Sequence, residues 1–185
     1  MFDRSSVVEL SEKKTDIHEH LLTLYGLVLG LNAQVVVELG AGQSTYALCA
    51  GVNATGGHLW SIDLYQTALV QGGPPKGSDL SKEPNFTFLH TDDIGAAIGW
   101  DRKIDLLFID TSHEYEHTKK ELNTWLKFVK VGGKIAMHDT IMASVQNQGC
   151  RIALDEFLKE RGGQYEAVHY DNCNGLSILT KLKED

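Results

Sequence analysis

One stretch of the chain, VVVELGAGQSTY at residues 35–46, constrains the fold more than any other. Its three consecutive valines, with no polar alternation, predict a strand that is covered on both faces, as in a parallel α/β sheet. Gly40 and Gly42 then predict a sharp turn at which the backbone can approach a ligand without a Cβ in the way. Either Ser44 or Thr45 can cap the helix that follows. We therefore expect a ligand to bind at this turn.

The acid at the end of this strand indicates the chemistry of that ligand. Glu38 repels a pyrophosphate, but it can accept hydrogen bonds from an ammonium group, which S-adenosylmethionine carries beside its sulfonium. The dinucleotide fingerprint G-x-G-x-x-G is incomplete because Thr45 occupies the third glycine position, so NAD is disfavoured. An acid followed by a G-x-G turn resembles the first motif of the class I S-adenosylmethionine-dependent methyltransferases. This resemblance implies a set of contacts with the methyl donor: Glu38, Gly40, Ala41, Gly42 and Ser44.

Length and charge limit the possible partners. The 185 residues suit a single domain, residues 1–185, in which residues 1–31 form a helical segment that packs over the ligand crevice. The net charge of -8, with no run of Lys or Arg, argues against nucleic acid or a membrane surface and favours a small-molecule substrate. No apolar signal core or span of roughly 18 residues is present, which predicts a cytoplasmic protein. The sequence leaves a homo-oligomer open.

The second predicted strand also ends in an acid. The segment HLWSID, residues 58–63, ends at Asp63, which lies 23 residues beyond Gly40. In nucleotide-binding α/β units an acid at this point accepts hydrogen bonds from the ribose hydroxyls, at a spacing of about 20 residues. We therefore predict that Asp63 binds the ribose of the donor. The alternative is an ordinary loop carboxylate that faces solvent.

A third strand is predicted at residues 85–90, after a loop rich in proline and glycine at residues 71–85. Such a long loop is either a lid that contacts the acceptor or a disordered crossover. The resemblance implies an acid near the end of this strand that contacts the adenine amino group. Asp92 and Asp93 both occupy this place, and one of them is equally suited to cap the next helix. We favour Asp92 as the adenine contact.

Polar residues also close the fourth and fifth predicted strands, residues 104–110 and 133–139. The fourth strand is expected beside the first, at the crevice where doubly wound sheets bind ligands. Because parallel neighbours bring their carboxyl ends together, Asp110 should converge with His138 and Asp139. Two carboxylates with an imidazole make a site for a hard divalent cation such as Mg²⁺.

The segments LFIDTSHEYEHTKKEL and VGGKIAMHDT sharpen the resemblance. They are similar to a branch of small-molecule O-methyltransferases that includes macrocin O-methyltransferase and cephalosporin hydroxylase-like proteins, over about residues 15–140. The branch implies a doubly wound, Rossmann-like sheet of seven strands, mostly parallel with an antiparallel C-terminal strand. It also implies that Asp110 and Asp139 hold a divalent metal that binds the acceptor hydroxyl. His138 stands where several relatives have an acid, and is the third candidate ligand.

The implied reaction is an in-line attack of an acceptor oxygen on the sulfonium methyl, with Asp110 at the reacting centre. Neutral imidazole is available near pH 7, so His113 or His138 is a candidate general base. We favour His113, because His138 is also a candidate metal ligand. Three rival functions remain: an NAD-linked oxidoreductase, a donor-binding module without transfer activity, and a metal-dependent hydrolase.

The remaining elements follow from spacing and composition. We expect the first dozen residues to be loosely held and Thr15 to cap a helix with apolar positions at helical spacing. A further helix is predicted at residues 151–159, followed by two closing strands at residues 165–170 and 176–180. Residues 141–150 are expected to line the acceptor pocket through a group of amides: Gln146, Asn147 or Gln148.

Overall fold

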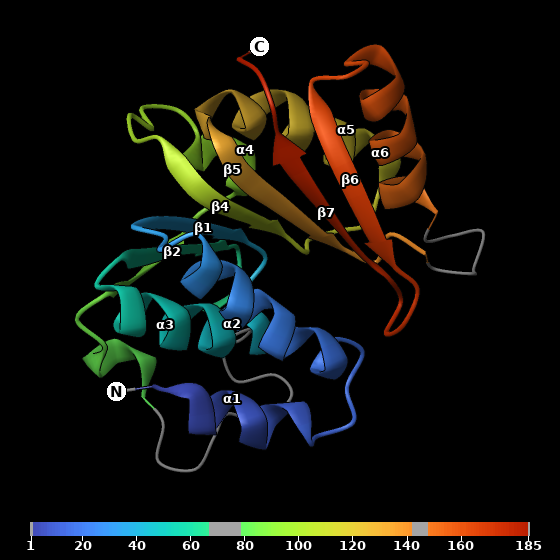
Figure 1. The fold of residues 1–185 in the computed structure, drawn as a ribbon. Coiled ribbons are helices and arrows are strands. Elements are labelled where there is room, and N and C mark those ends of the chain that lie inside the picture. Colours follow the sequence, from blue (N-terminus) through green and yellow to red (C-terminus); the bar gives the residue numbers. More distant parts are fainter. Residues whose placement is uncertain (1, 67–78, 142–147, 185) are drawn as a thin grey trace.

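The computed structural model describes residues 2–66, 79–141 and 148–184, and it is built around one seven-stranded sheet (Figure 1). The strands lie in the order β3-β2-β1-β4-β5-β7-β6, and only β7 runs antiparallel to its neighbours. The predicted doubly wound, mostly parallel sheet is therefore confirmed. The strand bounds are β1 Val35–Leu39, β2 His58–Asp63, β3 Phe86–His90, β4 Ile104–Ile109, β5 Val129–His138, β6 Tyr165–Tyr170 and β7 Leu176–Lys181.

Helices cover both faces of the sheet (Figure 1). One face carries α1 (Arg4–Ser11), α2 (Leu21–Gly30) and α3 (Gln43–Thr55), and the other carries α4 (Asp93–Ala96), α5 (Tyr115–Trp125) and α6 (Gly149–Glu160). Short 3₁₀ helices occupy His18–His20, Leu80–Lys82 and Leu126–Phe128. In the described part of the chain, no helix combines the length and apolarity that a membrane crossing requires.

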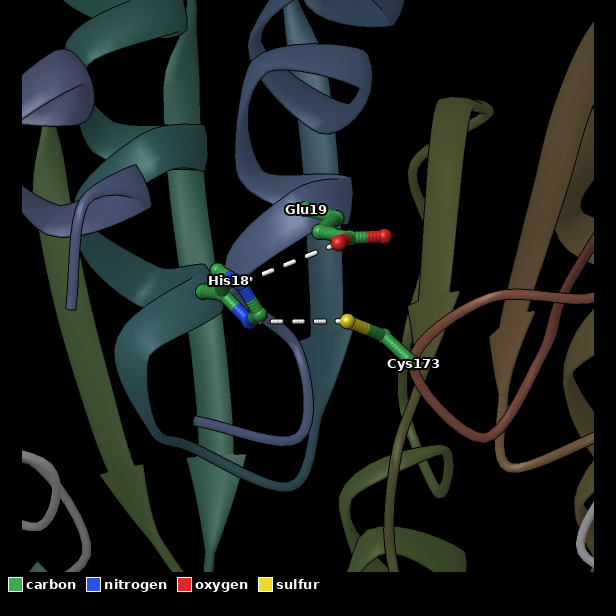
Figure 2. A group of neighbouring side chains, drawn as sticks. All are labelled: His18, Glu19 and Cys173. Atoms are coloured by element: carbon green, nitrogen blue, oxygen red, sulfur yellow. Dashed lines mark hydrogen bonds and ion pairs between the residues drawn. The ribbon is translucent and has the colours of Figure 1, made fainter. Parts of the chain in front are cut away.

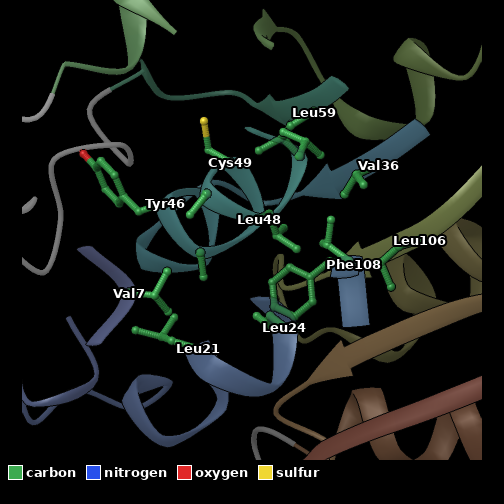
Figure 3. Close-up of a cluster of buried hydrophobic side chains, with 14 of the residues drawn as sticks. Val7, Leu21, Leu24, Val36, Tyr46, Leu48, Cys49, Leu59, Leu106 and Phe108 are labelled. Carbon is green, nitrogen blue, oxygen red and sulfur yellow. The ribbon is translucent and has the colours of Figure 1, made fainter. Parts of the chain in front are cut away.

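The sheet separates two hydrophobic cores, and β4 contributes to both. Leu106 and Phe108 pack with α1, α2 and α3 on one face, as Figure 3 shows, whereas Leu107 and Ile109 pack with α5 and α6 on the other. This alternation follows from the strand geometry, which points successive side chains to opposite faces. Burial of each such side chain stabilises the fold by roughly 1.5–3 kcal/mol. The carboxyl ends of the strands are thereby held in fixed positions.

The N-terminal prediction needs two corrections. The first residues are ordered, because the Asp3 carboxylate accepts hydrogen bonds from the first turn of α1 and Val7 is fully buried against α3. Thr15 does not cap a helix; its hydroxyl donates to the side chain of Gln43 at 2.6 Å, and α2 begins only at Leu21. That the N-terminal segment covers the ligand crevice stays a prediction.

The other element predictions differ from the structure mainly at their ends. β5 begins at Val129 rather than residue 133, because its first residues pair with β4 before a register shift. The two closing strands are confirmed. Most of the predicted loop at residues 71–85 lies outside the described residues, as do Gln146 and Asn147, while Gln148 is exposed just before α6.

Candidate active site

The turn after β1 contains two glycines with different structural demands. Gly40 has φ of 86°, and a Cβ there would lie 1.8 Å from the carbonyl oxygen of Asp110. Only glycine allows β1 to approach the end of β4 so closely. A Cβ on Gly42 would meet no described atom within 4 Å. Packing therefore explains Gly40, whereas Gly42 leaves space beside the turn.

Glu38 does not line the pocket; its hydrogen bonds hold the start of α3 and the β2 strand against the turn. Its carboxylate is fully buried and accepts hydrogen bonds from the hydroxyls of Ser44, Thr45 and Ser61, at 2.5, 2.7 and 2.5 Å. Burial raises the pKa of Glu38 to about 7, against the opposing effect of the three hydroxyls. The predicted direct contact with the donor ammonium is therefore not supported. Thr45, rather than Ser44, accepts a hydrogen bond from the N–H of Gly42.

A pocket of about 470 Å³ opens at the carboxyl ends of β1, β2, β3 and β4. This volume lies within the usual range for a small-molecule site, about 300–1,000 Å³. Four residues predicted to contact the donor line the pocket: Gly40, Asp63, Asp92 and Asp110. Three others, Ala41, Gly42 and Ser44, do not line it. The structure thus brings the predicted acids of three strand ends to one pocket.

Two acids in this pocket, Asp63 and Asp92, also accept hydrogen bonds from the backbone near them. Asp63 accepts hydrogen bonds from the N–H groups of Ala41, at 2.9 Å, and Tyr65, at 2.7 Å. Asp92 is exposed and caps α4 by accepting from the N–H of Gly95 at 2.7 Å. Asp93 is buried instead, so the two neighbouring acids have different surroundings. Carboxylate oxygens have further lone pairs, which leaves both pocket acids able to accept from a ligand.

The ends of β4 and β5 bring together four residues, Asp110, His113, His138 and Asp139, which we call the β4–β5 group; of these, Asp110 lines the pocket. His113 Nε2 lies 2.8 Å from Asp139 Oδ2 and 3.3 Å from Asp110 Oδ1. His138 Nδ1 lies 3.1 Å and 3.5 Å from the same two oxygens. The predicted convergence of strand ends is thus present, with two imidazoles placed between two carboxylates.

The short distances between imidazoles and carboxylates favour the charged forms of both. Hydrogen bonds with Asp110 and Asp139 raise the pKa of His113 to about 10. Burial opposes the charge of His138, but the same carboxylates raise its pKa to about 11. Burial likewise opposes the charge of Asp139, yet both imidazoles hold its pKa well below the ordinary value. In the cation-free protein the two carboxylates therefore favour the charged form of both histidines.

The residues present fit a divalent cation. Donor atoms of Asp110, His113 and Asp139 all lie within 4.8 Å of one another. Oδ1 of Asp139 is buried and has no hydrogen-bond partner among the described residues, which leaves it available to a cation. His138 differs from the predicted ligand, because its Nε2 contacts the Cys173 carbonyl oxygen at 2.8 Å and its Nδ1 faces the carboxylates. The geometry favours His113 as the imidazole ligand.

Two residues of the β4–β5 group adopt an unusual backbone conformation. His113 has φ of 58° and Asp139 has φ of 56°, both in the left-handed region that few non-glycine residues occupy. Such positions cost free energy and cluster at functional sites. The sequence carries no signal for these two angles.

The segment His18–His20 and the β6–β7 loop, which are distant in the sequence, pack against each other and against His138. His18 and Glu19 face Cys173 of the β6–β7 loop, with His18 Nδ1 3.5 Å from the Cys173 sulfur (Figure 2). The ring of His20 packs edge-on against His138, with centroids 5.7 Å apart. Sequence reasoning missed this contact because its partners lie more than 150 positions apart.

Sequence reasoning also missed a second group, formed by buried Asp93 and Glu121 with half-buried His117, which we call the α4–α5 group. Asp93 and His117 line the pocket, and their side chains pair at 2.8 Å. The spacing of His117 and Glu121, four residues apart on one helix, was the available signal.

Comparison with known proteins identifies the family. Residues 37–140, more than half of the chain, match the model of a family described as a methyltransferase domain. No curated protein matches the sequence.

Several solved structures share the fold. The SAH-bound methyltransferase PaMTH1 from Podospora anserina has a TM-score of 0.71 at 13% identity, over 96% of this chain and 88% of that one. Cofactor-bound Rv0187 from MTB has a TM-score of 0.70 at 13% identity, over 98% and 89%. The O-methyltransferase NovP has a TM-score of 0.67 at 16% identity, over 90% and 81%. The chain thus belongs to the methyltransferase domain family, with the fold of class I S-adenosylmethionine-dependent methyltransferases.

Proposed function

We propose that this protein transfers a methyl group from S-adenosylmethionine to a hydroxyl oxygen of a small molecule, with help from a divalent cation. One observation carries the proposal. Asp110 belongs both to the pocket at the strand ends and to the β4–β5 group, so the two sites share a wall. A donor in the pocket and an acceptor at the β4–β5 group would meet at this residue.

The pocket suits the donor in charge and in shape. Its carboxylates, at the ends of β2, β3 and β4, complement a ligand with an ammonium group and a sulfonium. Asp63 would accept hydrogen bonds from the ribose hydroxyls, and Asp92 would accept from the adenine amino group. The donor supplies a methyl group that its positive sulfur already activates. The protein's main task is therefore to position the acceptor in line with it.

The β4–β5 group would prepare the acceptor. Asp110, His113 and Asp139 would hold a cation such as Mg²⁺, which lowers the pKa of an acceptor hydroxyl. His138 keeps the Asp139 carboxylate in place through its own contact with Cys173. His113 would instead serve as the base only if Asp110 and Asp139 held the cation without it, because a nitrogen that binds a cation has no lone pair left for a proton. Neutralisation of the two carboxylates by the cation would then lower the pKa of His113 from about 10 towards the ordinary 6.5.

Calorimetry with S-adenosylhomocysteine tests the donor site. We expect binding by the wild type and none of NADH. Asp63→Asn should weaken binding roughly 10- to 150-fold, because a hydrogen bond to a charged group contributes about 1.5–3 kcal/mol. Asp101→Asn is the matched control, since that side chain is 88% exposed. Binding of NADH instead, or equal affinity in both variants, would overturn the assignment.

Turnover separates an enzyme from a module that only binds the donor. Methyl transfer to a panel of small hydroxylated acceptors should increase when Mg²⁺ is added to chelator-treated protein. Donor binding without transfer to any acceptor would favour the binding module. Transfer that is unaffected by the chelator would remove the cation from the proposal and leave the methyltransferase assignment standing.

A further inference from the structure

The α4–α5 group occupies the wall of the donor pocket and has no role in the chemistry proposed above. Asp93 begins α4, while His117 and Glu121 lie four residues apart on one face of α5. The group shares no residue with the β4–β5 group. Thr111, which follows Asp110 in the chain, donates a hydrogen bond from its hydroxyl to Glu121 Oε1 at 2.8 Å.

The distances within the group are close to those of a cation site. His117 Nε2 lies 2.8 Å from Asp93 Oδ2 and 3.8 Å from Glu121 Oε1. One donor atom from each residue falls within 4.8 Å of the other two. In a tetrahedral zinc site, bonds of about 2.0–2.2 Å place the ligand atoms roughly 3.3–3.6 Å apart. Small side-chain shifts would therefore bring all three ligands onto one ion.

An unpartnered buried oxygen is the second observation. Glu121 is fully buried, and its Oε2 has no hydrogen-bond partner among the described residues. Asp93 is only 7% exposed, so two carboxyl groups share a space with little water. A buried polar atom without a partner costs free energy, and two buried carboxylates together cost more. Either a proton or a cation must satisfy them.

We propose that Asp93, His117 and Glu121 form a second divalent-cation site, which takes Zn²⁺ or an ion of similar preference. One imidazole and two carboxylates provide three protein ligands, the number found in zinc sites that keep an open position. Because Asp93 and His117 line the donor pocket, the open position faces that pocket. The ion would join α5 to the start of α4, the two elements that form this wall.

Zinc content measured on the full chain tests the site. Protein stripped with a chelator is equilibrated with Zn²⁺, freed of unbound ion by gel filtration and assayed by atomic absorption. We expect His117→Gln to bind one ion per chain fewer than the wild type, and Glu121→Gln to show the same loss. His169→Gln removes an exposed imidazole on β6 and should bind as many ions as the wild type. Cys173→Ser accounts for any ion at the group in Figure 2.

Thermal melting gives a second readout that does not require activity. Zn²⁺ should raise the melting temperature of the wild type and of Asp139→Asn. The rise should be smaller in His117→Gln and in Glu121→Gln, because these variants lack a ligand of the α4–α5 group. Glu121→Gln keeps the size of the side chain, so it serves if His117→Gln does not fold.

Two outcomes would overturn the proposal. If both variants bind as much zinc as the wild type, no ion occupies the group. If Asp139→Asn loses the only bound ion, a proton satisfies Glu121 instead. Failure of the cation role proposed for the β4–β5 group would appear separately, as methyl transfer that is unaffected by the chelator.

Discussion

The β4–β5 group and the α4–α5 group both combine imidazoles with carboxyl groups, yet their surroundings favour charged side chains in the first and a protonated carboxyl group in the second. In the first, hydrogen bonds with two carboxylates raise the pKa of His113 to about 10. In the second, one imidazole faces two carboxyl groups, and burial, with Asp93 nearby, raises the pKa of Glu121 to about 9. The ratio of imidazoles to carboxylates, together with burial, thus decides whether such a group holds charges or a proton.

The largest effect is expected from Asp139→Asn. Asparagine tolerates the φ of 56° at this position, but its neutral amide removes the negative charge that would bind the cation and that forms ion pairs with His113 and His138. We expect methyl transfer to fall by about 100-fold or more, as when one positioned charge-stabilising group is lost from an active site. Transfer of a radiolabelled methyl group measures this. Similar rates for Asp139→Asn and the exposed control Asp101→Asn would contradict the role of the group.

His113 should make the stability of the cation-free protein depend on pH. Its pKa in the folded state, about 10, lies above the ordinary 6.5. The stabilisation is therefore complete below pH 6.5 and is lost as the pH rises through 10. His113→Asn should be less stable than the wild type at pH 6 by about 3 kcal/mol, the order for breaking a buried ion pair. Urea unfolding at pH 6 and pH 10 should show this difference shrinking; a constant difference would refute the ion network.

Glu121→Gln sharpens the contrast, because it replaces a carboxyl group that we expect to be protonated. The pKa of Glu121 rises from 4.5 to about 9 on folding. Its protonated form stabilises the fold below pH 4.5, and this contribution is lost as the pH rises through 9. Relative to the variant, the cation-free wild type should lose up to about 1.4 kcal/mol per pH unit in this window. Parallel stability curves for the two proteins would show that Glu121 is already charged.

Glu38 is a buried carboxyl group with no imidazole beside it, so Glu38→Gln tests the effect of burial alone. Of these variants it should change the pH dependence of stability least. Burial raises the pKa of Glu38 from 4.5 to about 7, so the stabilisation by its protonated form is lost over that narrower range. The wild type should decline relative to the variant between pH 4.5 and 7, and the difference should then stay constant. Continued decline above pH 8 would mean that the three hydroxyls favour ionisation of Glu38 less than their hydrogen bonds suggest. Denaturant titration at pH 5, 7 and 8 decides this.

Much of the fold follows from local patterns in the sequence. Apolar runs that end in an acid identified β1, β2 and β4, and the rule that parallel strands align their carboxyl ends placed Asp110 with Asp139. The strand positions followed from residues adjacent in the sequence, and the convergence of the two acids followed from the strand order usual for a doubly wound sheet. The confirmed antiparallel strand followed from the resemblance to a family.

Local sequence patterns did not predict which side chains of the site are charged. Glu38 seemed available to a ligand because its partner Ser61 becomes adjacent only through the register of β1 on β2. The pKa of His113 depends on Asp139, which lies 26 positions later. Such shifts arise from distances and burial after packing, which residue spacing along the chain does not specify.

The hydrogen bond between His138 and the Cys173 carbonyl oxygen also affects the order in which the two parts of the site form during synthesis of the chain. All described residues that line the donor pocket lie between Gly40 and His117, so their chain is synthesised early. The contact that holds His138 comes instead from the β6–β7 loop, which follows these residues in the chain, and β7 must insert between β5 and β6 to place it. Contacts between distant parts of a chain form slowly. A nascent chain would thus complete the pocket at the strand ends before it completes the β4–β5 group.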